Sequence, residues 1–129
     1  MMKSIRLVPV LVVVLMVLAA VPAFSQSNVL DLTGESGVKE VEVRSRGLAF
    51  EVSEIRVNRG DTVRVTYVNG GGRHDWVIDE FEGARTAMIS AGQSETVEFV
   101  ADRAGTFEFY CSVPGHRSAG MYGSFVVVD

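Results

Sequence analysis

The pattern that most constrains the fold is an alternation of apolar and polar residues over residues 62–68. Val63, Val65 and Tyr67 fall on one face of an extended chain, and the polar residues between them fall on the other. A period of two is typical of a strand with one buried face, because successive side chains of a strand point to opposite sides. This stretch therefore predicts a half-buried β-strand.

Other short segments of the chain have the same character. Val38, Val41 and Val43 alternate with charged residues and predict an earlier half-buried strand, with Lys39, Glu40, Glu42 and Arg44 on its polar face. Further strands are predicted at residues 48–50, 54–58, 73–78, 96–100, 106–111 and 122–128, with a short strand or loop at residues 84–89. Glycine, asparagine and aspartate turns separate them, and no long amphipathic helix is visible. We expect an all-β fold, an antiparallel β-sandwich of about seven or eight strands, with a small β-barrel as the alternative.

The first 25 residues are predicted to be a signal peptide. Lys3 and Arg6 precede an apolar run over residues 7–21, and a small-x-small cleavage site ends at Ser25. A retained membrane anchor is the alternative, since the apolar run is nearly long enough to span a bilayer. Residues 26–37 are small and polar and are expected to form a flexible segment, so the folded domain is predicted at residues 38–129.

Charge and cysteine content exclude several classes of protein. Without Lys3 and Arg6, 10 basic residues face 16 acidic ones, which argues against nucleic acid and anionic lipid as partners. The single cysteine, Cys111, cannot form a disulfide within the chain. It is therefore an intermolecular bridge, a reactive thiol, a core residue or a metal ligand.

Residues 109–121 gather three candidate ligands on one short loop. Cys111, His116 and Met121 are separated by four residues in each interval, and Pro114 and Gly115 make a turn between the first two. A thiolate, an imidazole and a thioether suit a soft transition metal, and two histidines, one cysteine and a distant axial methionine form the blue-copper arrangement. His74, the second of only two histidines, follows a glycine-rich turn and is expected to complete the set. The other methionine of the mature chain, Met88, has no such spacing and is expected in the core or at its rim.

Residues 105–127 resemble the copper-loop signature of the cupredoxins, the small blue copper proteins. The two four-residue intervals are similar to those of rusticyanin, sulfocyanin and auracyanin. The stretch from Glu54 to Asn69, followed by His74, resembles the family's earlier strands, so the likeness covers about residues 50–128. It implies a Greek-key β-sandwich that holds one copper ion, with His74, Cys111 and His116 as equatorial ligands and Met121 as the axial one.

The chain departs from the cupredoxin pattern after its first histidine. Asp75 stands where many cupredoxins have asparagine or serine to hydrogen-bond the cysteine loop. We hypothesise that this carboxylate accepts the same hydrogen bond and stabilises Cu(II), with a solvated turn aspartate as the alternative. Val52 and Ser53 also replace a proline that is common in the family.

The predicted function is an exported, periplasmic or extracellular electron carrier that cycles between Cu(II) and Cu(I). The resemblance implies that His116 is the electron port and that redox proteins dock transiently at a small apolar patch of Val113, Pro114, Gly115 and Ala119. We expect a monomer. We also expect that it is not an enzyme, because both histidines are already assigned and none is left for a second copper centre. Trp76 is expected in the core beside the site. The alternatives are copper storage, delivery or sensing, and a domain that binds no metal.

Overall fold

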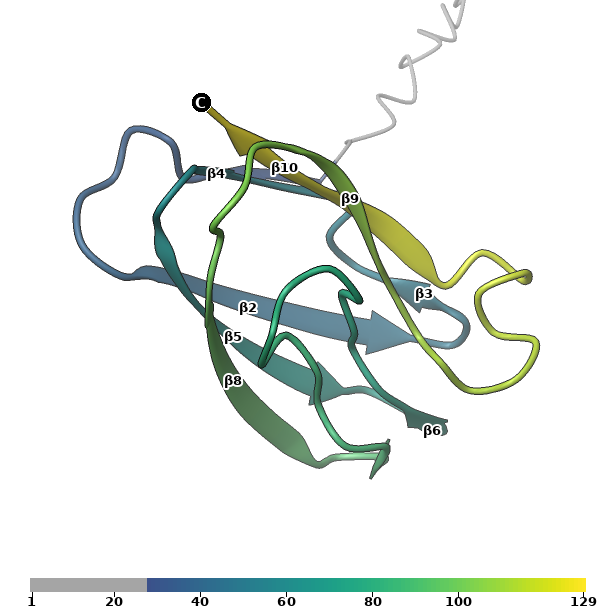
Figure 1. Cartoon of the computed structure of the whole chain (residues 1–129). Helices are drawn as coiled ribbons and strands as arrows, with labels where there is room; N and C mark the ends of the chain where they lie inside the picture. Colours follow the sequence, from purple (N-terminus) through teal and green to yellow (C-terminus); the bar gives the residue numbers. More distant parts are fainter. Residues whose placement is uncertain (1–27) are drawn as a thin grey trace, which may run out of the picture.

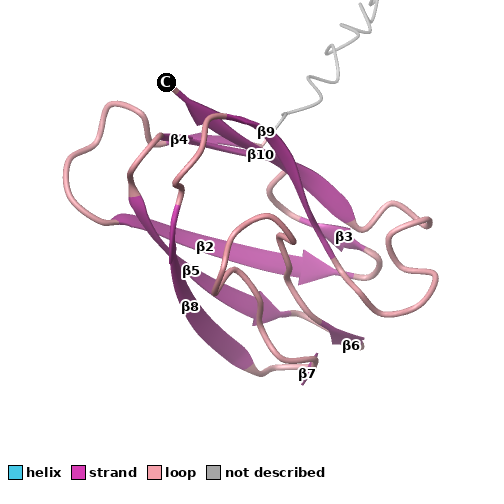
Figure 2. Ribbon diagram, in the orientation of Figure 1, coloured by secondary structure: helices cyan, strands magenta, loops and turns pink. Residues whose placement is uncertain are grey.

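The computed structural model describes residues 28–129, so the predicted signal peptide at residues 1–25 lies outside the described residues. Within them the chain forms strands and loops and no helix (Figure 2). No helix in this part is long and apolar enough to cross a membrane.

Two four-stranded sheets pack face to face (Figure 1). The first has the order β1 (Val29–Asp31), β4 (Glu54–Asn58), β10 (Tyr122–Val128), β9 (Gly105–Tyr110), and the second has the order β3 (Ala49–Phe50), β2 (Lys39–Arg46), β5 (Thr62–Asn69), β8 (Ser94–Val100). A small third sheet pairs β6 (Arg73–His74) with β7 (Ile89–Ser90). The predicted all-β sandwich is confirmed, and seven of these ten strands are three or more residues long.

The pairing within the sheets differs from the prediction in its direction. Strands β9 and β10 pair antiparallel, as do β5 and β8 and also β2 and β3. However, β1 and β10 both run parallel to β4, and β2 runs parallel to β5. The sheets are therefore mixed, because the chain crosses between the two layers instead of joining each neighbouring pair by a hairpin. An alternating pattern shows which face of a strand is buried but does not show its direction.

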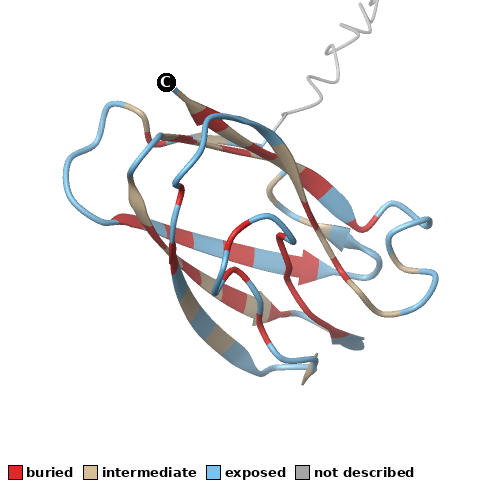
Figure 3. Cartoon of the chain, viewed as in Figure 1, coloured by how far each residue is buried: buried red, intermediate tan, exposed pale blue. Residues whose placement is uncertain are grey.

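The buried face of strand β2 differs from the one that the sequence pattern suggested. Its buried side chains are Lys39, Val41, Val43 and Ser45, whereas Val38, just before the strand, is exposed. Figure 3 shows the buried and exposed residues alternating along β2. A strict period of two from Val41 leads to Lys39, not to Val38. The inward ammonium group lies 3.4 Å from a carboxylate oxygen of Asp61 and donates to the carbonyl oxygen of Gly37, at 3.1 Å.

The segment expected to be flexible, residues 26–37, contributes a strand. Within its described part, β1 pairs with β4 and thereby extends the first sheet, and Leu32 just after it is buried. The region predicted as a strand at residues 73–78 is extended only over β6 and then continues as an isolated bridge at Val77.

The core lies between the two sheets and is rich in aromatic and β-branched side chains. It includes the inward faces of β2, β4, β5 and β10, together with Trp76, Phe81, Phe99 and Phe109. Burying side chains of this size contributes about 1.5–3 kcal/mol each before the entropy of ordering is subtracted. This core forms the rigid body from which the loops at one end of the sandwich extend.

A close backbone approach at that end of the sandwich yields the first prediction. A Cβ on Gly70 would lie 2.2 Å from the carbonyl oxygen of Ser45, whereas a Cβ on neighbouring Gly71 would meet nothing within 4 Å. Gly70→Ala should therefore lower the free energy of unfolding by about 1–3 kcal/mol, and Gly71→Ala should change it by less than about 0.5 kcal/mol. Urea titration of both copper-free variants measures the difference, and equal midpoints would contradict the close approach.

Candidate metal centre

His74 lies at the end of a turn that a buried asparagine organises. The Asn69 side chain donates to the carbonyl oxygens of Gly72 and Ile89, at 3.0 and 2.9 Å, and its oxygen accepts from the N–H of Gly71 at 3.1 Å. Gly72 has a φ of 75°, and a Cβ there would lie 3.0 Å from Nε2 of His74. The turn thus requires glycine both for its backbone conformation and for the space beside the imidazole.

The C-terminal loop closes on itself through its backbone. The N–H of Cys111 donates to the carbonyl oxygen of Met121 at 3.1 Å, and the N–H of Met121 donates to the carbonyl oxygen of His116 at 3.0 Å. Gly115 provides the turn with a φ of 83°. As a result Cys111 and Met121 are fully buried, while His116 is half-buried at the surface.

Three donor atoms from these two segments converge on one point. The Nδ1 atoms of His74 and His116 lie 3.0 Å apart, and Sγ of Cys111 lies 3.7 and 3.6 Å from them. A triangle with these sides has a circumradius of about 2.0 Å, close to the ~2.0–2.3 Å of metal bonds to imidazole and thiolate. The donor set and its dimensions therefore fit a small transition-metal ion.

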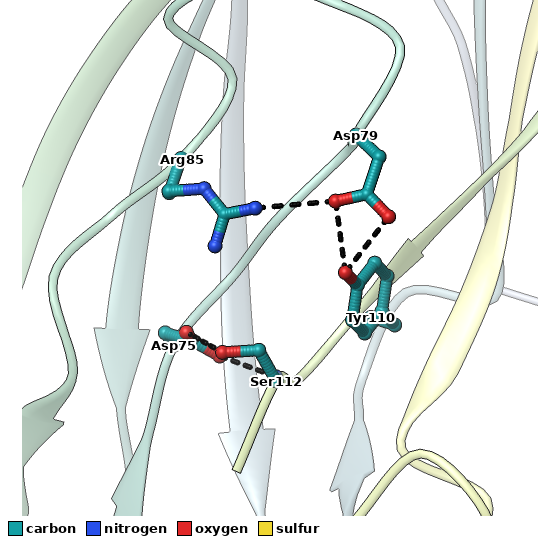
Figure 4. Close-up of polar contacts among 5 residues, drawn as sticks. All are labelled: Asp75, Asp79, Arg85, Tyr110 and Ser112. Carbon is teal, nitrogen blue, oxygen red and sulfur yellow. Dashed lines mark hydrogen bonds and ion pairs between the residues drawn. The ribbon is translucent and has the colours of Figure 1, made fainter.

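Hydrogen bonds join the segment that carries His74 to the segment that carries Cys111, and we call this set of bonds the clamp. Figure 4 draws its bonds between Asp75 and Ser112. Val77 and Tyr110 exchange two backbone bonds, of 3.0 and 2.9 Å. The carboxylate of Asp75 accepts from the N–H of Ser112 at 2.6 Å and from the Ser112 hydroxyl. The clamp fixes the relative positions of His74 and Cys111 without any metal.

A second carboxylate completes the outer part of the clamp. Asp79 accepts from the hydroxyl of Tyr110 at 2.8 and 2.9 Å and pairs with Arg85 at 3.1 Å (Figure 4). The guanidinium of Arg117 lies 4.0 Å from the centre of the Tyr110 ring. No role was predicted for Asp79, Tyr110 or Arg117, although Asp79 follows Asp75 and Val77 at the spacing of one strand face.

The predicted hydrogen bond of Asp75 is present, and the alternative of a solvated turn residue is wrong, because Asp75 is only 2% exposed. Trp76 is fully buried against Phe99 and Phe109, as expected. Met88 is 41% exposed, so the expectation of a core position is wrong and a position at the rim remains.

A shallow hollow exposes one side of the site. It is lined by Gly47, Leu48, Gly71, Gly72, Arg73, His74, Val113 and His116. Val113 was expected beside His116, and Pro114, Gly115 and Ala119 are exposed on the same loop. Leu48, which is 47% exposed, comes from the turn between β2 and β3 and was not predicted here, because nothing in the sequence relates that turn to the copper loop.

The sequence was compared with those of known protein families. The sequence pattern of the copper binding proteins, plastocyanin/azurin family, matches residues 38–128. The chain belongs to the plastocyanin/azurin family of copper-binding proteins. The predicted class, a cupredoxin with one copper ion, is thereby confirmed.

Individual relatives support the same family. The copper-resistant cuproprotein CopI of Rubrivivax gelatinosus is 32% identical in an alignment of 104 positions, which covers 66% of this chain and 63% of that protein. The chain thus spans less than two thirds of that relative. Auracyanin-A of Chloroflexus aurantiacus is 33% identical, over 71% of this chain and 76% of its own length.

Solved structures agree with the sequence relatives. The dithionite-reduced auracyanin of Roseiflexus castenholzii has a TM-score of 0.64 and 26% identity, over 73% of this chain and 100% of its own. A blue copper oxidase of Nitrosomonas europaea shares the fold, with a TM-score of 0.63 and 22% identity, over 70% of this chain and 38% of its own.

The acid–base state of the donors predicts how copper affinity in this family member depends on pH. Burial raises the pKa of the Cys111 thiol, while burial and the nearby His116 ring lower the pKa of His74. At neutral pH the thiol is therefore protonated and the His74 ring is neutral. Because a metal binds the thiolate, binding should release about one proton from Cys111.

The affinity for Cu(I) should accordingly rise about tenfold per pH unit between about pH 7 and the raised pKa of the thiol. Competition with a chelator of known affinity measures this slope, and calorimetry in two buffers counts the released protons. Affinity that is constant from pH 7 to 9 would show that Cys111 is already a thiolate in the copper-free protein.

Replacing Asp75 tests whether its charge affects the copper. Asparagine keeps one oxygen that can accept from the Ser112 N–H but removes the negative charge. Asp75→Asn should therefore destabilise Cu(II) and raise the reduction potential, by about 59 mV for each tenfold change in the equilibrium.

Asp79→Asn is the matched control for this experiment. Asp79 lies on the same segment, but its side chain is 50% exposed and its polar partners are Tyr110 and Arg85 instead of Ser112. Its replacement should change the potential much less, because solvent screens its charge. Voltammetry of both variants gives the comparison, and a potential that is unchanged or lower in Asp75→Asn would refute the hypothesis.

Proposed function

We propose that this chain is an exported type 1 copper protein that carries single electrons between redox partners. In this proposal His74, Cys111 and His116 are the equatorial ligands and Met121 is the weak axial ligand. The observation that carries it is the convergence of one thiol and two imidazole nitrogens on a point about 2.0 Å from each. Copper bound there would supply a Cu(II)/Cu(I) couple whose potential depends on the axial ligand and on the surroundings of the cysteine sulfur.

The role of the protein is to hold the donors still while the charge changes. The clamp fixes Cys111 against the segment of His74, and the backbone bonds of the loop fix Met121 and His116. Donors that cannot rearrange hold a geometry between those that Cu(II) and Cu(I) prefer. Little reorganisation therefore accompanies electron transfer. Trp76 and Phe109, each two residues along the chain from a proposed ligand, are fully buried core residues, so the inner side of the site is apolar and closed to water.

Electrons are proposed to pass through His116. Its ring joins the buried donors to the hollow, which it lines together with Leu48 and Val113. A small, mostly apolar contact of this kind suits brief encounters, since weak electron-transfer complexes have small interfaces. The protein would act as a monomer in the periplasm or outside the cell, after cleavage of the signal peptide.

The chain is proposed to have no catalytic activity of its own. Its two histidines both belong to the proposed site, so none remains within this chain for the second copper centre that copper oxidases and nitrite reductases need. A substrate would also need an open coordination position, and all four positions are assigned to side chains.

Copper handling is the second candidate function. It is favoured by the similarity to a copper-resistant cuproprotein, at 32% identity over 66% of this chain. A protein for storage or delivery would bind Cu(I) tightly and would not need a reversible Cu(II) state. The two functions therefore differ in what the bound copper can do.

Spectra and voltammetry of the copper-loaded protein test the proposal. We expect an intense visible thiolate-to-copper band and a reversible one-electron wave. Cys111→Ser should remove the band, while Ser118→Ala, on the same loop but outside the donor set, should keep it. A colourless protein that binds Cu(I) tightly and gives no reversible wave would favour copper handling instead.

A further inference from the structure

Arg73 is the one unpaired cation among the described residues. Residues 28–129 contain nine arginines and one lysine, and every one of them except Arg73 lies within 4.0 Å of a carboxylate oxygen. In an acidic chain, where carboxylates outnumber cations, pairing of nearly every cation is the natural outcome. The exception is therefore informative.

The exception lies at the proposed electron port. Arg73 is exposed and lines the hollow beside His116, where it is the only arginine, lysine or carboxylate residue. The nearest acidic residue in the sequence, Asp75, is buried, and both of its oxygens accept from Ser112. The structure thus leaves a guanidinium free at a surface that is otherwise apolar.

The neighbouring arginines do not have this property. Arg46, at the end of β2 next to the turn that carries Leu48, lies 3.7 Å from Glu51. Arg117, which follows His116, lies 2.5 Å from Glu108. Both add positive charge near the hollow, but each is already balanced by a carboxylate of this chain.

We infer that the redox partner of this protein presents a carboxylate to Arg73 when its cofactor edge docks at His116. The partner is thus a redox protein with an acidic docking edge, which places apolar groups against Leu48 and Val113 and one acidic side chain against the guanidinium. The inference rests on the proposed electron-carrier function and adds the charge of the partner to it.

The physical reason is the loss of water when the hollow closes. A guanidinium that becomes covered by an uncharged or basic surface loses hydration without compensation, which disfavours such partners. A carboxylate of the partner compensates that loss, and its fork-like match to arginine also fixes the orientation. At an ionic strength near 0.15 M, where charges are screened over about 8 Å, this local contact outweighs the distant acidic residues of the body.

The test uses two c-type cytochromes as probes, one with an acidic haem edge and one with a basic haem edge. Second-order rate constants for electron exchange with the copper-loaded protein are measured by stopped flow at about 0.15 M ionic strength. Arg73→Gln should slow the reaction with the acidic cytochrome about two- to fivefold, the range expected for an exposed ion pair. It should leave the reaction with the basic cytochrome unchanged or faster, and Arg73→Lys should retain most of the wild-type rate.

Arg59→Gln is the matched control. Arg59 is 55% exposed and pairs with Asp129, the last residue of the chain. The C-terminus lies at the other end of the sandwich from β6 (Figure 1), so the replacement of Arg59 changes the net charge by the same amount away from the hollow. A change in reduction potential would move both cytochrome rates in the same direction, so a slower reaction with the acidic cytochrome alone identifies docking. Equal behaviour of Arg73→Gln and Arg59→Gln would overturn the inference while leaving the proposed function intact. Failure of the wild-type copper protein to exchange electrons with either cytochrome would instead refute the proposed function.

Discussion

The site depends on one set of contacts, the hydrogen bonds between the segment after His74 and the segment around Cys111. Val77 pairs with Tyr110, and Asp75 accepts two bonds from Ser112. Each bond contributes only about 1 kcal/mol net, but a buried carboxylate such as Asp75 would cost more than that if it lost its donors. The two segments are therefore held in one register, and the donor atoms of His74 and Cys111 are brought together as a consequence.

Aromatic packing in the core also holds together the two segments that the clamp joins. Trp76 and Phe109 alternate with the clamp residues along the same two segments and pack against each other, with ring centres 5.9 Å apart. The two segments thus have hydrogen bonds on one side and aromatic packing on the other. This arrangement explains how four candidate ligands from two distant segments of the sequence occupy one end of the sandwich, and why only His116 reaches the surface.

Much of the fold and of the site could be predicted from the sequence. The alternation at Val63, Val65 and Tyr67 predicted a buried face that the structure has. The single cysteine and the two histidines were predicted to form one site, and their side chains converge. Strand direction could not be predicted, because a parallel and an antiparallel strand bury the same alternate residues. Lys39 was placed on the wrong face because residue type was given more weight than spacing.

The contacts that the sequence did not predict all join segments far apart in the chain. The hydroxyl of Tyr110 meets Asp79 across 31 residues, and no sequence pattern predicted this bond. The bond from Ser112 to Asp75, across 37 residues, was expected only from the resemblance to the cupredoxins. Leu48 reaches the hollow from a turn with no pattern of its own. Such contacts follow from how the two sheets are connected, so no local pattern contains them.

The most direct test of the account is a comparison of crystal structures of the copper-free, Cu(I) and Cu(II) forms. If the clamp fixes the site, the distances among Nδ1 of His74, Nδ1 of His116 and Sγ of Cys111 should agree in all three forms to within about 0.3 Å. Copper should lie inside their triangle, with the sulfur of Met121 on its axis. A copper-free form in which Cys111 and His74 have moved apart, or copper bound elsewhere, would contradict it.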